Sequence, residues 1–244
     1  MLFRSVIEKR AYFQFYMHRT GHWLGMDVHD CGGYLEPGEL VLIDAGCELD
    51  GYASDITRTF PANGTFTGPQ RELYNLVLAS QEAAAAVTKA GARFTDPHEA
   101  SVKVLAQGML DLGLLDKNRC GSLDDVIEKR AYFQFYMHRT GHWLGMDVHD
   151  CGGYLEPSEL GQSSERKDAL TGETIVNRPA RVLRPGMVLT IEPGIYVRPA
   201  AGVPEKFHNI GIRIEDDAIV TATGCELISR GVPVKPEEIE ALMR

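Results

Sequence analysis

The sequence predicts an α+β fold, because strand-like and helix-like segments occupy separate blocks of the chain. A strand-like hairpin comes first, two amphipathic helices follow it, and two more strand-like segments lie near the C-terminus. A regular alternation of strands and helices would instead indicate a parallel α/β sheet. A chain of 244 residues is also long enough to bury a sizeable core.

The first block is a hairpin. Residues 39–47 are rich in Val, Leu and Ile, Asp50-Gly51 is a hairpin turn signal, and residues 52–60 form the returning strand. Two helices follow this hairpin along the chain.

The two helices begin with recognisable start signals. Thr67 to Gln70 has the pattern of a capping box, and the first helix is predicted to end at Gly91. Residues 96–99 open the second helix in the same way, with proline at its first position, and this helix is predicted to end near Gly113.

The C-terminal part of the chain returns to strands. Residues 158–181 are polar and contain Gly, Ser and Pro, which predicts an exposed loop. Strands are predicted over residues 187–197, with an interruption at Pro193-Gly194, and over residues 210–221. Residues 237–243 are predicted to form a short helix.

Two aspartates lie on opposite arms of the predicted hairpin. If Leu49 and Asp50 form the turn, Asp44 faces Asp55 directly; if Asp50 and Gly51 form it, the two lie diagonally on one face. In both registers like charges crowd together, which destabilises a sheet unless a cation lies between them. Two solvated aspartates on an exposed face are the alternative interpretation.

Two glutamates interrupt the apolar C-terminal strands. Glu192 follows Val-Leu-Thr-Ile, and Glu215 follows Ile-Arg-Ile. Glutamate is rarely buried unless it is paired or binds a metal. A position at the end of an edge strand would explain either residue alone, but explains both less well.

Three histidines lie within thirteen residues. His138, His142 and His149 share this segment with Gly141 and Gly145. Packing alone does not readily explain this density, and the glycines indicate a close approach of the backbone to another group. His142 could bind a metal through one ring nitrogen while an acceptor fixes the other.

A long exact repeat is present. Val6–Pro37 is identical to Val126–Pro157. Stacked structural repeats diverge because each copy has its own environment, so this repeat indicates a recent duplication or rearrangement rather than a solenoid.

Composition excludes several classes of protein. The 34 acidic residues exceed the 25 Lys and Arg, and a net charge of −9 argues against a nucleic-acid binder. No apolar run approaches the ~20 residues that span a bilayer, and the first ten residues have no signal-peptide core. The five cysteines form no CxxC pair, which favours reduced thiols in the cytoplasm.

Six short motifs, in this order, resemble the signature of the pita-bread metallopeptidases, and within them bacterial aminopeptidase P (Xaa-Pro aminopeptidase): Ile43-Asp44-Ala45-Gly46, Ser54-Asp55-Ile56-Thr57-Arg58, Gly141-His142-Trp143-Leu144-Gly145, Val148-His149-Asp150, Ile191-Glu192-Pro193-Gly194 and Arg213-Ile214-Glu215-Asp216-Asp217. The resemblance implies a pita-bread catalytic domain over residues 38–244, preceded by the duplicated segment at 1–37. The fold is expected to be incomplete at its N-terminal side. In the family that side carries another substrate-facing histidine, whose place here falls near Asp27.

The resemblance also implies a site with two metal ions. Its ligands are Asp44, Asp55, His142, Glu192 and Glu215, with Asp55 and Glu215 bridging the two ions. Four carboxylates and one imidazole favour Mn²⁺, with Co²⁺, Mg²⁺ or Fe²⁺ as alternatives. His22, in the first copy of the repeat, could replace His142, but only the second copy precedes the strands that carry the two glutamates.

The implied function is removal of the N-terminal residue from peptides with proline at position two. Glu192 and His149 are the expected catalytic residues: Glu192 accepts the proton of the attacking water, and His149 donates a hydrogen bond to the substrate. His138, His149 and Arg213 are the expected substrate-binding residues. A peptide is the expected partner, and binding to nucleic acid or to a membrane is not expected. The chain could form a homo-oligomer. An Xaa-Pro dipeptidase (prolidase-like) and an inactive fragment are the alternatives; creatinase-like relatives without metal ligands fit less well, because all five ligand positions are filled.

Overall fold

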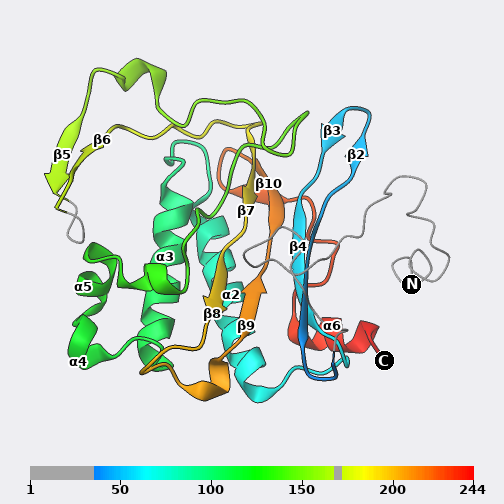
Figure 1. The fold of residues 1–244 in the computed structure, drawn as a ribbon. Helices are drawn as coiled ribbons and strands as arrows, with labels where there is room; N and C mark the ends of the chain where they lie inside the picture. The colour runs from blue at the N-terminus through cyan, green and yellow to red at the C-terminus, as the bar shows by residue number, and fades with distance from the viewer. Residues whose placement is uncertain (1–35, 168–171) are drawn as a thin grey trace, which may run out of the picture. The chain divides into compact units, whose positions relative to one another are not determined.

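The computed structural model describes residues 36–167 and 172–244, which combine antiparallel strands with helices (Figure 1). The predicted α+β class is therefore confirmed. The first copy of the repeat, including Asp27 and His22, lies outside the described residues apart from positions 36 and 37. The expectations for that segment stay predictions.

The first hairpin forms where it was predicted. Strand β1 (Leu40–Ala45) pairs antiparallel with β4 (Ile56–Pro61), and the tip carries the short strands β2 (Glu48–Leu49) and β3 (Tyr52–Ala53). The hairpin stands beside the other strands in Figure 1.

The turn of this hairpin decides between the two registers. Asp50 and Gly51 both have positive φ angles, +52° and +80°, as a tight hairpin turn requires. Asp44 consequently pairs with Thr57, and Asp55 lies diagonally from Asp44 rather than opposite it.

Two long helices follow the hairpin, α2 (Gly68–Val87) and α3 (Asp96–Asp111). The predicted capping box at the first helix is confirmed: Thr67 and Gln70 each accept the other's backbone N–H through their side chains. The predicted capping box at the second helix is wrong. The first residue of α3 lies inside the helix, and its carboxylate accepts the N–H of Arg93 instead.

Two strand pairs near the C-terminus form one long, interrupted hairpin. Strand β7 (Val188–Ile191) pairs with β10 (Asp216–Val220), and β8 (Gly194–Val197) pairs with β9 (Ile210–Arg213). The predicted interruption at Pro193-Gly194 is confirmed. It separates β7 from β8, and β9 and β10 are separated directly opposite it.

Several short elements complete the described chain, and sequence reasoning anticipated only the last of them: α4 (Lys117–Cys120), α5 (Leu123–Glu128), η2 (Ala131–Gln134), η3 (Pro157–Glu159), β5 (Ser164–Lys167), β6 (Thr174–Asn177), η4 (Glu205–Phe207), β11 (Cys225–Leu227) and α6 (Pro236–Leu242). Strands β5 and β6 correct the prediction that residues 158–181 form only a loop. Their side chains are almost all exposed, so no hydrophobic alternation marks them as strands.

Helices α2 and α3 pack beside the interrupted hairpin and form the main core with it (Figure 1). Leu73, Leu105 and Met109 from the helices and Ile195 and Ile212 from the strands are all fully buried. This packing holds the strand interruption in a fixed place. Within the described ranges, no helix is long and apolar enough to cross a membrane.

Candidate metal centre

One cavity of about 1070 Å³ is lined by all eight residues that were proposed from the sequence to bind metal, to bind substrate or to take part in catalysis: Asp44, Asp55, His138, His142, His149, Glu192, Arg213 and Glu215. They come from both hairpins and from the histidine segment. The cavity therefore lies where these three parts of the chain meet.

The two glutamates come from the interruption of the long hairpin. Ile191 pairs with Asp216 and Gly194 pairs with Arg213, so each strand has two residues between these pairs and the register is the same on both sides. In that register Glu192 and Glu215 lie opposite each other. Like charges facing each other across strands destabilise a sheet, which makes this an unusual place for two glutamates without a counter-charge.

The histidine segment runs alongside β7 and extends the edge of its sheet. The N–H of Thr190 donates to the carbonyl of His142 at 3.0 Å, and the N–H of Glu192 donates to the carbonyl of Thr140 at 2.8 Å. A Cβ at Gly141 would lie 2.1 Å from the Thr190 carbonyl oxygen, so only glycine permits this approach. The backbone thereby brings His142 next to Glu192.

Three of the proposed ligands form a tight group. One donor atom from each of Asp55, His142 and Glu215 lies within 4.8 Å of the others, and all three side chains are buried. The Nε2 atom of His142 lies 3.3 Å from Asp55 Oδ2 and 3.6 Å from Glu192 Oε1. Its Nδ1 lies 3.0 Å from the Trp143 carbonyl, to which it must donate, and Nε2 thus faces the carboxylates.

Asp44 lies at the more exposed side of the group and forms an ion pair with Arg213. Burial and the neighbouring Asp55 raise the pKa of the Asp44 carboxyl, although Arg213 opposes the shift. Sequence reasoning placed Arg213 near the ligand carboxylates, and its guanidinium lies at Asp44.

The pKa shifts in the cavity indicate that its buried carboxylates repel one another. Burial, together with Glu192 and Asp55, raises the pKa of Glu215 to about 9. Burial and the other carboxylates raise the pKa of Glu192 to about 7, despite His142 and Arg213. Burial acts against the charged form of Asp55 as well, but hydrogen bonding with His142 holds the pKa of this aspartate below its usual value.

His142 shows the reciprocal effect. Burial lowers the pKa of the His142 imidazole, but Asp55 and the Trp143 carbonyl outweigh it and raise the value to about 9. The protonated ring thus serves as the positive charge that the carboxylates lack. A divalent cation would supply that charge instead, and four carboxylates with one imidazole are a donor set that hard and borderline cations accept. The side chains therefore fit a metal centre.

Supporting residues that sequence reasoning missed hold the carboxylates in place. The hydroxyl of Thr57 donates to Glu215 Oε2 at 2.5 Å and accepts from Arg213 Nε at 3.0 Å. The carboxylate of Asp217 accepts the backbone N–H of Asp55 at 3.2 Å. Both residues belong to the motifs quoted above, but nothing in their spacing marks them as supports.

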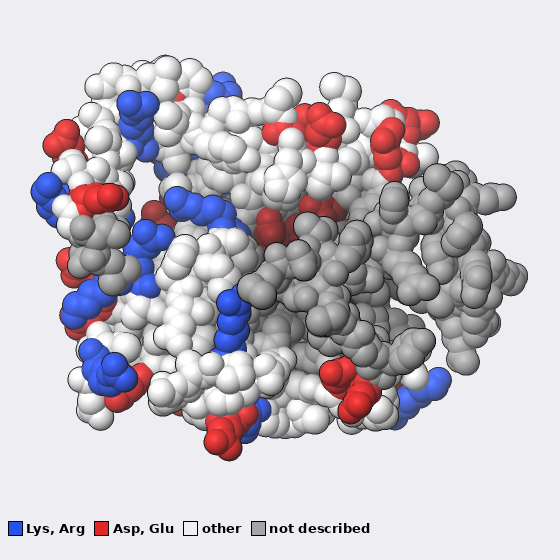
Figure 2. Space-filling model, viewed as in Figure 1, with Lys and Arg blue, Asp and Glu red and all other residues white. Residues whose placement is uncertain are grey.

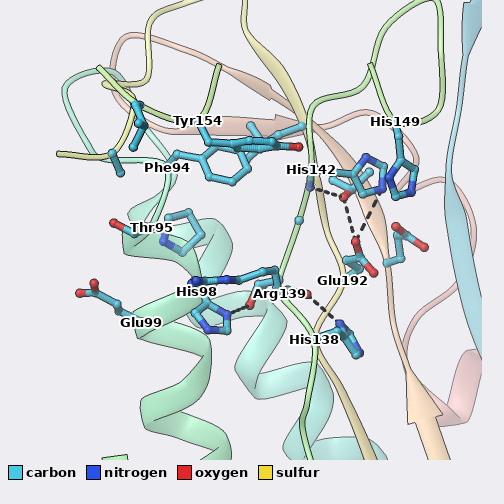
Figure 3. A pocket seen from close by; sticks show the side chains of 18 of the residues that line it. Phe94, Thr95, His98, Glu99, His138, Arg139, His142, His149, Tyr154 and Glu192 are labelled. Carbon is cyan, nitrogen blue, oxygen red and sulfur yellow. Dashed lines mark hydrogen bonds and ion pairs between the residues drawn. The ribbon is translucent and has the colours of Figure 1, made fainter. Parts of the chain in front are cut away.

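The other two histidines lie beside the carboxylate group (Figure 3). The exposed ring of His149 stacks on His142, with ring centroids 3.9 Å apart. His138 is held by the hydroxyl of Tyr196, 2.9 Å from its Nε2 atom. Tyr196 also accepts a hydrogen bond from Arg213 Nη1 at 3.3 Å, and it was not among the residues expected from the sequence.

Comparison with known proteins gives consistent matches. Residues 32–222 match Metallopeptidase family M24. The chain is 46% identical over 209 residues to the Xaa-Pro aminopeptidase of Escherichia coli K12, and 44% identical over 209 residues to that of Haemophilus influenzae. Among solved structures, Pseudomonas aeruginosa aminopeptidase PepP matches with a TM-score of 0.74 at 47% identity.

These matches cover most of this chain but less than half of each relative. The two sequence alignments include 86% of this chain, and 42% and 43% of the respective relatives. The structural match includes 88% of this chain and 43% of the Pseudomonas protein. The chain thus spans a little over two fifths of the length of these relatives.

Proposed function

Because the chain belongs to metallopeptidase family M24, we propose that it removes the N-terminal residue from peptides whose second residue is proline. The observation that carries the proposal is the buried group of Asp55, His142 and Glu215 beside Glu192 in one cavity. The names of the relatives, Xaa-Pro aminopeptidases at 44–46% identity, support the choice of substrate.

The proposed cofactor is a pair of Mn²⁺ ions held by five side chains: Asp44, Asp55, His142, Glu192 and Glu215. The oxygen-rich donor set favours Mn²⁺, Co²⁺, Mg²⁺ or Fe²⁺ over a thiolate-type zinc site. Asp55 and Glu215, which belong to the buried group with His142, would be shared between the ions, as the resemblance to the pita-bread metallopeptidases implies. When bound, the ions would lower the pKa of a water molecule and polarise the scissile carbonyl.

The chain's own residues would then orient the peptide and move the proton. Glu192 lines the cavity next to His142 and would accept the proton of the attacking water. His149 presents an exposed ring to the cavity and would donate a hydrogen bond to the substrate. His138 and Arg213, which share the Tyr196 hydroxyl, would form the adjoining wall.

The proposed setting follows from the same features. The carboxylates that line the cavity would attract the positively charged N-terminal ammonium group of a peptide. An acidic chain with a net charge of −9 and no CxxC pair suits a cytoplasmic enzyme that binds neither nucleic acid nor membrane.

The test is cleavage of a length series of peptides by the Mn²⁺-loaded chain. Ala-Pro, Ala-Pro-Ala and Ala-Pro-Ala-Ala are incubated with it, and the products are identified by mass spectrometry. The proposal expects free alanine from the tri- and tetrapeptide, with Ala-Ala-Ala-Ala as the uncleaved control. Cleavage of Ala-Pro alone would show a dipeptidase, and no cleavage by a folded, metal-loaded chain would show an inactive fragment.

A further inference from the structure

A second group of polar side chains lies next to the proposed metal ligands but does not line the cavity. It consists of Arg58, Gln81, Asp216, Ser229 and Arg230, and these five residues are called the Asp216 cluster below. Figure 2 shows acidic atoms deep in the hollow near the centre of the face. The Asp216 carboxylate, by contrast, is fully buried, although its residue directly follows Glu215.

Both oxygens of the Asp216 carboxylate are in use. Oδ1 accepts hydrogen bonds from Arg58 Nη2 at 2.8 Å and from Ser229 Oγ at 2.7 Å. Oδ2 accepts from Gln81 Nε2 and forms an ion pair with Arg230 Nη2, both at 3.1 Å. Removing one partner of a buried ion pair leaves an uncompensated charge, which is strongly destabilising. The cluster therefore fixes β10 to β4 and α2 at this point.

Arg58 connects the cluster to the backbone of Glu215. A guanidinium carries five N–H donors, and one of those of Arg58 goes to Asp216. The other four go to the backbone carbonyl oxygens of Thr57, Glu215, Val232 and Pro233. The bond to the Glu215 carbonyl measures 2.5 Å, and the N–H of Glu215 donates to the Thr57 carbonyl at 3.1 Å. Both backbone polar groups of this proposed ligand are thus held by β4.

Gln81 makes the corresponding connection to the other glutamate. It is fully buried on α2, and its Nε2 donates to the carbonyl of Ile191 at 3.1 Å as well as to Asp216. That carbonyl belongs to the same planar peptide group as the N–H of Glu192, which donates to the Thr140 carbonyl. The peptide group that precedes Glu192 is therefore held from both sides.

We propose that Arg58 and Gln81 are positioning residues of the metal centre. Through the shared Asp216, Arg58 fixes the main chain at Glu215, and Gln81 fixes it at Glu192. Two carboxylates that repel each other across the strands thereby stay directed at the cations. This inference rests on the proposed function, because it assumes that both glutamates are metal ligands.

The test compares Mn²⁺ affinity with stability in two conservative variants. Arg58→Lys keeps the positive charge beside Asp216 but has three donors in place of five, and Gln81→Met keeps the size of the side chain without its amide. Isothermal titration calorimetry of the metal-free 244-residue chain measures the Kd for Mn²⁺. This Kd is expected to be about 10- to 100-fold higher in each variant, the usual effect of removing a residue that orients a ligand. Thermal unfolding of the same samples measures the Tm.

Two matched controls lose comparable contacts elsewhere on α2. Arg71→Gln breaks the ion pairs that join α2 to α6. Ser80→Ala removes a buried hydroxyl from the residue next to Gln81. Both controls are expected to lower the Tm and to leave the Kd for Mn²⁺ unchanged. A Kd that followed the Tm in all four variants would show a merely structural role and overturn the proposal.

A further comparison separates the two connections. In a Glu192→Ala background, Gln81→Met is expected to cause little further loss of Mn²⁺ affinity, whereas Arg58→Lys still weakens binding through Glu215. Equal further losses would contradict the assignment of one residue to each glutamate. Unchanged Mn²⁺ binding in both variants would overturn the positioning role alone. The expected changes in Kd without any cleavage of Ala-Pro-Ala by the unmodified chain would overturn the proposed reaction and leave the positioning role supported.

Discussion

At the scale of single residues, Thr57 connects two charged side chains that line the cavity, Glu215 and Arg213. Its hydroxyl contacts Glu215 Oε2 at 2.5 Å and Arg213 Nε at 3.0 Å. Thr57 is fully buried, so losing its hydroxyl would remove a buried hydrogen-bond partner of both side chains. Thr57 therefore orients a proposed ligand and is not itself one of the five proposed ligands.

Thr57→Val is therefore expected to weaken Mn²⁺ binding by about 10- to 100-fold, the usual effect of removing a residue that orients a ligand. Calorimetric titration of the two proteins with Mn²⁺ measures the difference. Thr59→Val is the matched control, because Thr59 is equally buried on the same strand but bonds to the backbone of Arg213. If both variants lost affinity equally, the specific role of Thr57 would be wrong.

The proposed ligands are also expected to differ from one another. Asp55→Ala or Glu215→Ala should abolish binding of both Mn²⁺ ions, since these buried carboxylates belong to the tight group with His142 and are proposed to be shared between the ions. Asp44→Ala should mainly weaken one ion, because Asp44 is half exposed and paired with Arg213. Metal analysis of the dialysed variants checks this. Similar mild losses in all three would contradict the shared role.

At the scale of elements, the candidate metal centre depends on the histidine segment, which runs alongside β7 and extends the edge of its sheet. Thr140 and His142 are bonded by their backbones to Glu192 and Thr190. The copy that precedes β7 places His142 3.3 Å from Asp55.

His142→Ala is accordingly expected to destroy metal-dependent cleavage, whereas His22→Ala is expected to leave it largely intact. A ligand must be held close to its productive position to serve a metal site. Cleavage of Ala-Pro-Ala and Mn²⁺ content, measured on both variants, check the prediction. Activity that survived His142→Ala and vanished with His22→Ala would assign the role to the first copy.

Elements with strong local signals were predictable from the sequence. The turn at Asp50-Gly51, the capping box at Thr67 and the interruption at Pro193 each have a local chemical cause, and each was found. The β5–β6 hairpin was not predictable, because its side chains face solvent and follow no hydrophobic alternation. The register of the first hairpin stayed open until the backbone of its turn was seen.

The candidate site divides in the same way. The proposed ligands lie in recognisable sequence motifs, and all five line one cavity. Thr57, Gln81 and Tyr196 could not be chosen in advance, since a threonine in a strand or a glutamine in a helix is common. Their importance arises from packing between segments that are far apart in the sequence, such as Thr57 against Glu215.

At the scale of the whole molecule, the chain is part of a pita-bread fold. Its match to the Pseudomonas aminopeptidase, at a TM-score of 0.74, includes 43% of that protein. The carboxylates of the candidate site repel one another, so the free energy of unfolding is expected to depend on what neutralises them. Protons and metal ions are expected to compete for that site.

The metal-free protein is expected to lose stability as the pH rises from about 5 to 9. The pKa of Glu215 is raised to about 9 and that of Glu192 to about 7, so the folded chain retains protons that the unfolded chain releases. The stabilising charge on His142, whose pKa is raised to about 9, is lost over the upper part of the same range. Asp55, with its lowered pKa, is charged throughout and does not offset the trend.

Mn²⁺ should reverse this dependence, because it replaces the protons and binds more tightly as they leave. Thermal unfolding at pH 5.5, 7 and 8.5, with and without Mn²⁺, measures both effects. The increase in Tm caused by Mn²⁺ should grow with pH, and Glu215→Gln should flatten the decline of the metal-free protein. A metal-free Tm that rose across this range would contradict the electrostatic account.

The central claim is that these five side chains form a site for two divalent cations. It is tested most directly by counting the Mn²⁺ ions that the folded 244-residue chain retains after incubation and dialysis, using elemental mass spectrometry. The account predicts two ions per chain in the unmodified protein. A folded sample that retained none would contradict it.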